Sequence, residues 1–184
     1  MNRRVVAISG PPGSGKTRIS RAVGKQLGAQ VVEYDRYEQQ TRRSAADIED
    51  WLRRGAPYDE IAVPGMAAAI AQAPGLVILD TPLGGGQAAQ IGPVDALVWI
   101  DCPADIALAR KLAQLAGTVP PGQAAGFTQW LGGYLAAYEK IVRPACEIQV
   151  LRVRPGANLI VDATRPADAV QSAVAAFISK LYRD

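Results

Sequence analysis

Residues 10–17 read Gly10-Pro11-Pro12-Gly13-Ser14-Gly15-Lys16-Thr17, directly after the apolar run Arg4 to Ser9 and directly before a helical pattern, Lys16 to Leu27. This is the GxxxxGK[ST] pattern of a phosphate-binding loop, in the strand-loop-helix context that the pattern requires. The glycines let backbone N–H groups point inward around a phosphate, and the positive end of the following helix adds to the attraction. Lys16 supplies a cation for the β- and γ-phosphates of a nucleotide, and Thr17 offers a hydroxyl to Mg²⁺. We therefore expect residues 10–17 to bind a nucleotide; the alternative is a glycine turn with an incidental lysine.

Four further apolar runs follow the first, and longer helical patterns alternate with them. This alternation is typical of βαβ units and a mostly parallel sheet. It predicts an α/β protein with the three-layer P-loop NTPase fold, in which a five-stranded parallel sheet carries helices on both faces. The predicted strands are Arg4 to Ser9, Gln30 to Tyr34, Leu76 to Leu79, Ala96 to Ile100 and Asn158 to Val161. The predicted helices are Lys16 to Leu27, Ala45 to Arg54, Gly65 to Ala73, Pro103 to Leu115, Phe127 to Val142 and Ala167 to Leu181. A length of 184 residues predicts a single domain, residues 1–184.

The composition excludes several kinds of site. The chain has no histidine, which excludes Ser-His-Asp and Cys-His nucleophile pairs and His-ligated zinc or haem. The formal net charge of +3, from 20 Lys and Arg against 17 Asp and Glu, is too small to indicate nucleic-acid binding. No apolar stretch approaches the ~18 residues that a membrane helix needs. The two cysteines, Cys102 and Cys146, fit a reduced compartment. We expect a cytoplasmic protein that binds neither nucleic acid nor membrane.

Aspartates follow four of the predicted strands: Asp35, Asp80, Asp101 and Asp162. In open α/β sheets, ligands bind beyond the carboxyl ends of the strands, and we expect two of these four aspartates to be functional. Asp80 ends an apolar strand, which is where a carboxylate that holds Mg²⁺ together with Thr17 is expected. Asp35 is the expected group that receives the proton of an attacking hydroxyl. The alternative for Asp35 is a turn aspartate that only hydrogen-bonds the backbone.

The loop alone leaves several classes of nucleotide-binding protein open. The NKxD element that reads guanine is missing, because neither Asn2 nor Asn158 is followed by Lys-x-Asp, and this favours ATP over GTP. Motor ATPases usually need a longer chain. The favoured class is therefore a kinase that phosphorylates a small-molecule acceptor. A regulatory P-loop ATPase and a nucleoside monophosphate kinase are the alternatives, and a homo-oligomer is compatible with the sequence.

Short stretches beyond the loop carry a resemblance to one family. They are residues 33–37, 98–101, 103–105, 108–111, 134–144 and 157–161. Together with the loop, they make the sequence resemble the uridine kinase family and its phosphoribulokinase and pantothenate kinase relatives. The resemblance implies an ATP-dependent transfer of the γ-phosphoryl group to a hydroxyl of a nucleoside or another small metabolite. It implies that Asp35 orients and deprotonates the acceptor hydroxyl. It also implies that Thr17 and Asp80 hold Mg²⁺, and that Arg110 reaches the transferred phosphoryl group from a lid.

The expected lid departs from that family. Ala107 stands where a lid arginine is usual, which leaves Arg110 and Lys111 as the nearby cations. We expect the lid within residues 110–126, since Gly117 to Gly126 is rich in Gly and Pro and suits a mobile segment; the alternative is an ordinary loop. The residues expected to contact the acceptor are Asp35, Tyr37, Arg42 and Arg43. The alternative for the two arginines is a solvated pair at the start of a helix.

Overall fold

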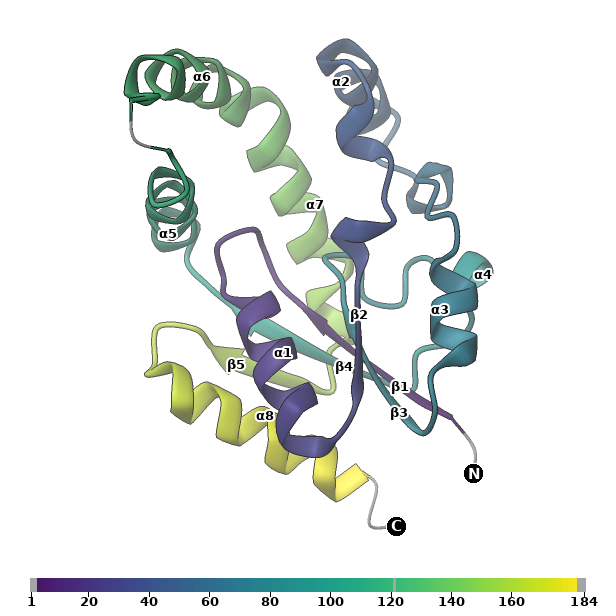
Figure 1. The fold of residues 1–184 in the computed structure, drawn as a ribbon. Coiled ribbons are helices and arrows are strands. Elements are labelled where there is room, and N and C mark those ends of the chain that lie inside the picture. Colours follow the sequence, from purple (N-terminus) through teal and green to yellow (C-terminus); the bar gives the residue numbers. More distant parts are fainter. Residues whose placement is uncertain (1–2, 121, 182–184) are drawn as a thin grey trace.

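The computed structural model describes residues 3–120 and 122–181, and a parallel sheet lies at its centre with helices on both faces (Figure 1). The strands are β1 (Arg4–Ser9), β2 (Gln30–Glu33), β3 (Leu76–Asp80), β4 (Ala96–Asp101) and β5 (Leu159–Asp162). They lie in the order β2-β3-β1-β4-β5, and each neighbouring pair is parallel. The predicted three-layer α/β architecture is confirmed, and every predicted strand end is within one residue of the observed end.

Helices connect the strands and also rise above the carboxyl edge of the sheet. They are α1 (Lys16–Leu27), α2 (Ala45–Arg53), α3 (Met66–Gln72), α4 (Ala88–Ile91), α5 (Ala104–Ala116), α6 (Ala124–Ala137), α7 (Arg143–Arg152) and α8 (Ala167–Leu181). Shorter segments are the 3₁₀ turns η1 (Tyr34–Arg36), η2 (Gln40–Arg42), η3 (Tyr58–Glu60) and η5 (Arg154–Gly156), and the π-helical turn η4 (Tyr138–Val142). No helix in the described part of the chain is long and apolar enough to cross a membrane.

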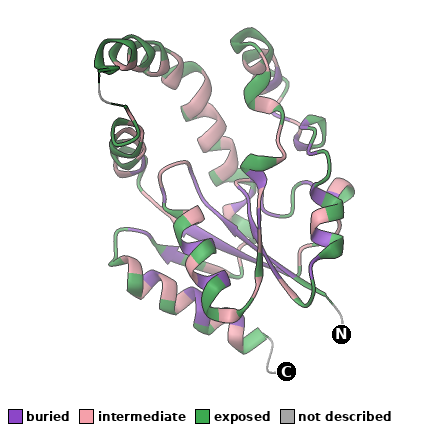
Figure 2. Cartoon of the chain, in the orientation of Figure 1, coloured by how far each residue is buried: buried purple, intermediate pink, exposed green. Residues whose placement is uncertain are grey.

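Alternate residues of the central strand β1 pack into opposite layers. Val5 and Ala7 belong to the core covered by α2, α3 and α4, whereas Val6 and Ile8 belong to the core covered by α1 and α8. This is the period of two expected for a strand whose two faces are both covered. Figure 2 shows the result as buried strands flanked by helices with exposed outer faces. The sheet is therefore a rigid base for whatever its carboxyl edge carries.

The long helical path after α5 differs from the prediction. The pattern predicts a helix that ends at Val142 because Pro144 follows, but α6 continues through η4 into α7 and ends at Arg152. Proline lacks an N–H group and clashes with the carbonyl four residues earlier in an α-helix. Here a π turn precedes it, in which the N–H of Arg143 bonds the carbonyl oxygen of Tyr138. The wider turn accommodates the proline, and the helical path continues to Arg152 before η5 leads into β5.

Candidate active site

The phosphate-binding loop lies at the middle of the carboxyl edge of the sheet. β1 is the central strand, and α1 begins at Lys16, directly after the loop. Gly13 and Gly15 have φ angles of 86° and 90°, in the left-handed region that favours glycine. A Cβ atom on Gly13 would lie 1.9 Å from the carbonyl oxygen of Ala107, so α5 packs directly against the loop backbone. The strand-loop-helix context that the motif requires is present.

The loop leaves several backbone N–H groups without an internal partner. Among its described residues, one backbone hydrogen bond is present within the loop, from the Ser14 N–H to the Pro11 carbonyl oxygen at 3.1 Å. Within residues 3–120 and 122–181, no backbone acceptor is found for the N–H groups of residues 13, 15, 16 and 17. A Cβ atom on Gly15 would meet no atom within 4 Å, so the space beside the loop is open there. Such N–H groups at a helix start can together bind a phosphate.

Asp80 lies beside the loop at the carboxyl end of β3, paired with Ile8 of β1. Its side chain is buried, and its Oδ1 atom has no hydrogen-bond partner in the described part of the chain. Burial raises the pKa of the Asp80 carboxyl group, and the nearby Thr17 hydroxyl and Lys16 ammonium oppose this rise. An unpartnered carboxylate oxygen near a hydroxyl suits Mg²⁺, which prefers oxygen ligands. Thr17 and Asp80 therefore fit a magnesium site.

Asp35 lies on η1, directly after β2, and its side chain is exposed. Its charge is one of the causes that raise the pKa of Asp80, so the two carboxylates are electrostatically coupled neighbours. No hydrogen bond or ion pair involves the Asp35 side chain among the described residues. Nearby Glu33 contrasts with it, because Glu33 accepts hydrogen bonds from Arg21 at 2.6 Å and from Arg36 at 2.9 Å. Asp35 therefore lacks the arginine partners that Glu33 has.

The other two strand-end aspartates hold the fold together. Asp101 accepts hydrogen bonds from Arg154 at 3.1 and 3.2 Å, which lower the pKa of its carboxyl group. Asp162 accepts hydrogen bonds from the hydroxyl and the N–H of Thr164, at 2.7 and 2.8 Å. Of the four aspartates, Asp35 and Asp80 are thus the two without such structural partners.

The residues expected around the acceptor do not converge as a cationic pocket. Tyr37 is partly buried and packs against the core beneath α2. Arg43 donates a hydrogen bond to Gln40 at 3.1 Å, and its charge contributes to the lowered pKa of Glu60. Arg42 is exposed on η2. Neither arginine lines either of the two cavities that flank the loop.

One of these cavities, of about 360 Å³, opens between α5 and the connection from β5 to α8. Ser14 and Gly15 of the loop line it, together with three arginines, Arg18, Arg110 and Arg165. We call it the arginine-lined cavity. Three guanidinium groups beside a phosphate loop suit a polyanion, because arginine donates bidentate hydrogen bonds to phosphate.

Arg110 belongs to this cavity and not to a lid over the acceptor. Its guanidinium donates a hydrogen bond to the Ala163 carbonyl oxygen at 3.0 Å, which turns it toward the connection from β5 to α8. Residues 110–116 of the expected lid are the last turns of α5, and residues 124–126 begin α6. Pro121, within the same segment, lies outside the described residues.

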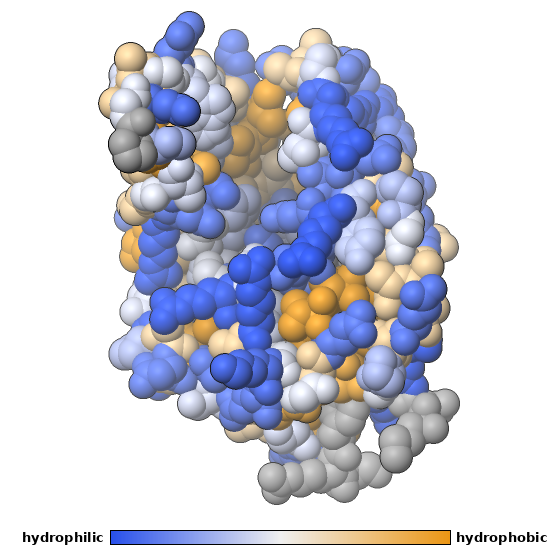
Figure 3. Space-filling view, viewed as in Figure 1, coloured by the Kyte–Doolittle hydropathy of each residue, from blue (hydrophilic) through white to orange (hydrophobic). Residues whose placement is uncertain are grey.

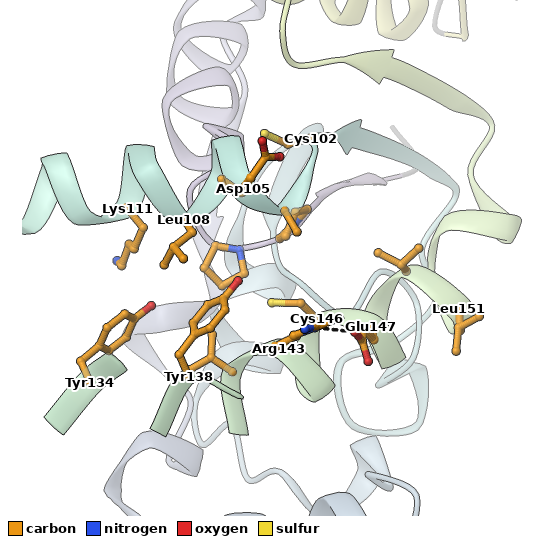
Figure 4. Close-up of a pocket in the computed structure, with 16 residues that line it drawn as sticks. Cys102, Asp105, Leu108, Lys111, Tyr134, Tyr138, Arg143, Cys146, Glu147 and Leu151 are labelled. Carbon is orange, nitrogen blue, oxygen red and sulfur yellow. Dashed lines mark hydrogen bonds and ion pairs between the residues drawn. The ribbon is translucent and has the colours of Figure 1, made fainter. Parts of the chain in front are cut away.

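The second cavity is larger, about 610 Å³, and lies on the other side of α5 (Figure 4). Pro11 and Pro12 of the loop line it, as do residues of α5, α6, η4 and α7. We call it the apolar cavity. Figure 3 shows apolar surface, in orange, at the back of the hollow between the α5–α6 side of the molecule and α2.

Sequence reasoning missed several residues of both cavities. Arg18 directly follows the phosphate motif, and Arg165 comes shortly after β5, so position along the chain could have indicated both. Tyr134 and Tyr138 are four residues apart in a helical pattern, which places them on one face. Nothing in the sequence shows which way that face points, because this depends on how the π turn orients the helix.

Comparisons with known proteins agree with the fold. The model of the ATPase family associated with various cellular activities (AAA) matches residues 6–63, less than a third of the chain. A sugar kinase from Janibacter sp. HTCC2649 is 15% identical over 97% of this chain and 95% of its own, with a TM-score of 0.53. A gluconokinase from Sinorhizobium meliloti 1021 is 13% identical over 99% of this chain and 96% of its own, with a TM-score of 0.54. No curated protein matches the sequence. The chain therefore has the P-loop NTPase fold, as predicted.

Proposed function

We propose that this protein is an ATP-dependent kinase, which transfers the γ-phosphoryl group to a hydroxyl of a small-molecule acceptor. The observation that carries the proposal is the pairing of an open phosphate loop with an exposed, unpartnered carboxylate, Asp35, at the end of the next strand. A protein that only binds a nucleotide has no need of a carboxylate that accepts a proton from an attacking hydroxyl. The kinases among the similar structures support the same class.

The nucleotide would lie along the loop. The open N–H groups and Lys16 bind the β- and γ-phosphates, and the arginine-lined cavity takes the rest of the nucleotide. In this arrangement Arg110 serves the nucleotide and not the acceptor. Thr17 and Asp80 would hold Mg²⁺, which neutralises phosphate charge when it is bound.

Asp35 performs the acid–base part of the transfer. Its carboxylate accepts the proton of the acceptor hydroxyl as the oxygen of that hydroxyl forms a bond to the γ-phosphorus. The bond between the γ-phosphorus and the bridging oxygen breaks, and ADP leaves with that oxygen. Lys16 stabilises the charge that develops on the transferred group and on the leaving phosphate. No covalent enzyme intermediate is needed.

The class of acceptor belongs to the proposal as well. The resemblance to the uridine kinase family supports a nucleoside or another small metabolite. The two similar structures are a sugar kinase and a gluconokinase, which supports a hydroxyl of a compact metabolite. A monophosphate acceptor has less support, because Arg42 and Arg43 do not converge on either cavity. A cytoplasmic location, consistent with two free cysteines, completes the proposal.

The test is ADP release from Mg-ATP, measured with and without a panel of nucleosides, sugars, sugar acids and monophosphates. A kinase releases ADP faster with one class of acceptor, and Lys16→Ala abolishes that release. The matched control is Lys25→Ala, an exposed lysine near the end of the same helix, which keeps the activity. A slow rate that no acceptor changes would contradict the proposal and favour a regulatory ATPase.

A further inference from the structure

The apolar cavity stands next to the loop but has few of the groups that a polyanion or a polyol needs. Sixteen residues line it, and four of them are charged: Asp105, Lys111, Arg143 and Glu147. Two of these neutralise one another, because Arg143 donates to Glu147 at 2.9 Å (Figure 4). A polyol buried there would leave most of its hydroxyls without partners, which is unfavourable.

Aromatic rings form one side of the cavity. In Figure 4, Tyr134 and Tyr138 face Leu108 and Lys111 of α5 across the space. The two tyrosine rings have centroids 6.3 Å apart and are tilted by 49°. They form a corner against which a further ring can pack, edge or face, at the separations that aromatic pairs prefer.

The aromatic side continues along α6 beyond the cavity. Trp130 stacks on Tyr134 with ring centroids 5.4 Å apart, and Phe127 stacks on Trp130 at 5.8 Å. No residue of α6 is charged and none is buried, so these rings are held by one another more than by the core. The rings therefore present an apolar surface that the fold itself does not cover.

The cavity borders the phosphate loop. Pro11 and Pro12 are part of its wall. Cys146, on the opposite wall, has a thiol pKa that burial raises to about 11, and the charge of Lys16 opposes that rise. The cavity and the phosphate loop therefore share the wall that Pro11 and Pro12 form.

We infer that the apolar cavity binds the body of the acceptor, and that this body is an apolar, ring-bearing group whose hydroxyl points to the phosphate loop. That the ligand is the phosphoryl acceptor rests on the proposed function. That the ligand is apolar and bears a ring rests on the residues that line the cavity. A volume of about 610 Å³ suits a small organic molecule. Tyr134 and Tyr138 pack against the ring, Leu108 covers its other side, and Lys111 lies at the α5 side. A sugar or sugar acid would meet few polar groups there for its many hydroxyls, because most of the lining residues are apolar and Arg143 is paired with Glu147.

Calorimetric titration with naphthylethanol, a ring-bearing alcohol, tests the cavity without depending on catalysis. We expect it to bind more tightly than gluconate or uridine, and we expect Tyr138→Ala to weaken its binding about 10-fold. Tyr138→Phe keeps the ring and the affinity. The matched control is Leu135→Ala, an exposed residue of α6 that does not line the cavity. Mg-ATP affinity that is unchanged in Tyr138→Ala shows that the variant is folded.

ADP release with the same compounds separates this inference from the proposed function. Release stimulated by naphthylethanol, with a KM that rises in Tyr138→Ala, supports both. Naphthylethanol binding that depends on Tyr138, without stimulated release from any compound, supports the ligand site and contradicts the kinase. Release stimulated by gluconate or uridine, with a KM that Tyr138→Ala leaves unchanged, supports the kinase and overturns the inference. Equal affinity of wild type and Tyr138→Ala for naphthylethanol also overturns it.

Discussion

The two cavities beside the phosphate loop differ in chemistry although one helix, α5, lines both. The arginine-lined cavity holds three guanidinium groups next to Ser14 and Gly15. The apolar cavity holds two tyrosines and two prolines, and two of its four charged residues are paired with each other. Arg110 faces the first cavity and Lys111, the next residue, faces the second. The single helix therefore separates a side suited to a polyanion from a side suited to an apolar molecule.

This difference fits separate sites for the two substrates, one cavity for the nucleotide and the other for the acceptor. The phosphate-loop motif alone does not show such a separation. Phosphate loops of many proteins bind a nucleotide, and the molecule that receives the phosphoryl group depends on the groups around the loop. Here the nucleotide and the acceptor would approach from opposite sides of α5. Lys16 and Thr17 begin α1, Asp80 ends the adjoining strand β3, and Asp35 follows β2; none of these four residues lines either cavity. The predictions below test whether the two sides are separate in this way.

The largest expected effect is that of removing the base. Asp35→Asn should lower the transfer rate by about 10²–10⁴-fold, because the amide cannot accept the acceptor's proton. Mg-ATP binding, measured by calorimetry, should persist, since the nucleotide side is intact. Asp59→Asn, an exposed aspartate on η3, is the matched control and should keep the rate. A loss of nucleotide affinity as large as the loss of rate would instead place Asp35 on the nucleotide side.

Gly13→Ala should disturb nucleotide binding and acceptor binding at once. The new Cβ atom would collide with the carbonyl oxygen of Ala107, and the φ angle of 86° is unfavourable for alanine. We expect a loss of about 3 kcal/mol in the free energy of unfolding, measured by urea denaturation, and weaker binding of both ligands. Gly28→Ala has a similar backbone strain, with a φ angle of 64°, but no atom within 4 Å, and should cost about 1 kcal/mol. Equal losses for the two variants would show that α5 yields to the new side chain.

Substitutions of the neighbouring residues Arg110 and Lys111 test most directly whether the two cavities bind their ligands independently. Arg110→Ala should weaken Mg-ATP binding about 10-fold, because a charged donor beside the phosphate loop is lost. Lys111→Ala should leave the nucleotide Kd unchanged and alter only the binding of the acceptor, since Lys111 lines the other cavity. Calorimetry with Mg-ATP on both variants measures this. If both variants lose nucleotide affinity equally, the two cavities are not independent.

The sequence predicted those features that depend on local spacing. The strands are short apolar runs bounded by turns, and the phosphate loop has its own motif, so the fold and residues 10–17 followed from sequence alone. The capping of α2 is equally local: the Ser44 hydroxyl accepts a hydrogen bond from the Asp47 N–H at 3.2 Å, three residues along the chain.

Features that depend on the orientation of a helix could not be predicted in this way. The direction of Arg110 is set by how α5 lies on Gly13, where a glycine without a side chain permits direct contact. The continuation of α6 into α7 depends on a π turn, which the sequence pattern does not predict. The apolar cavity lies where Tyr134 and Tyr138 stand opposite α5, so this cavity emerged only with the structure.

Asp80 lies beside the phosphate loop at the carboxyl end of β3, and its ionisation gives the smallest effect that we expect to measure. Burial raises the pKa of this carboxyl group in the folded protein above its value in the unfolded chain. The folded state therefore binds the Asp80 proton more tightly, and the stability linked to this group is present below the unfolded pKa of about 4 and is lost as the pH rises through the folded pKa. Asp80→Asn removes the ionisation, so without ligand at pH 7 it should melt about 2–4 °C above wild type.

The pH dependence separates this electrostatic effect from a change in packing. Below pH ~4 the wild-type carboxyl is protonated in both states, and the difference in Tm between wild type and Asp80→Asn should vanish. Mg-ATP should stabilise wild type more than the variant, because the asparagine supplies a poorer oxygen ligand for the metal. Differential scanning calorimetry across this pH range, with and without Mg-ATP, measures both effects. A Tm difference that stays constant with pH would mean that the Asp80 carboxylate is not destabilised by its burial, and that the variant acts through a change in packing.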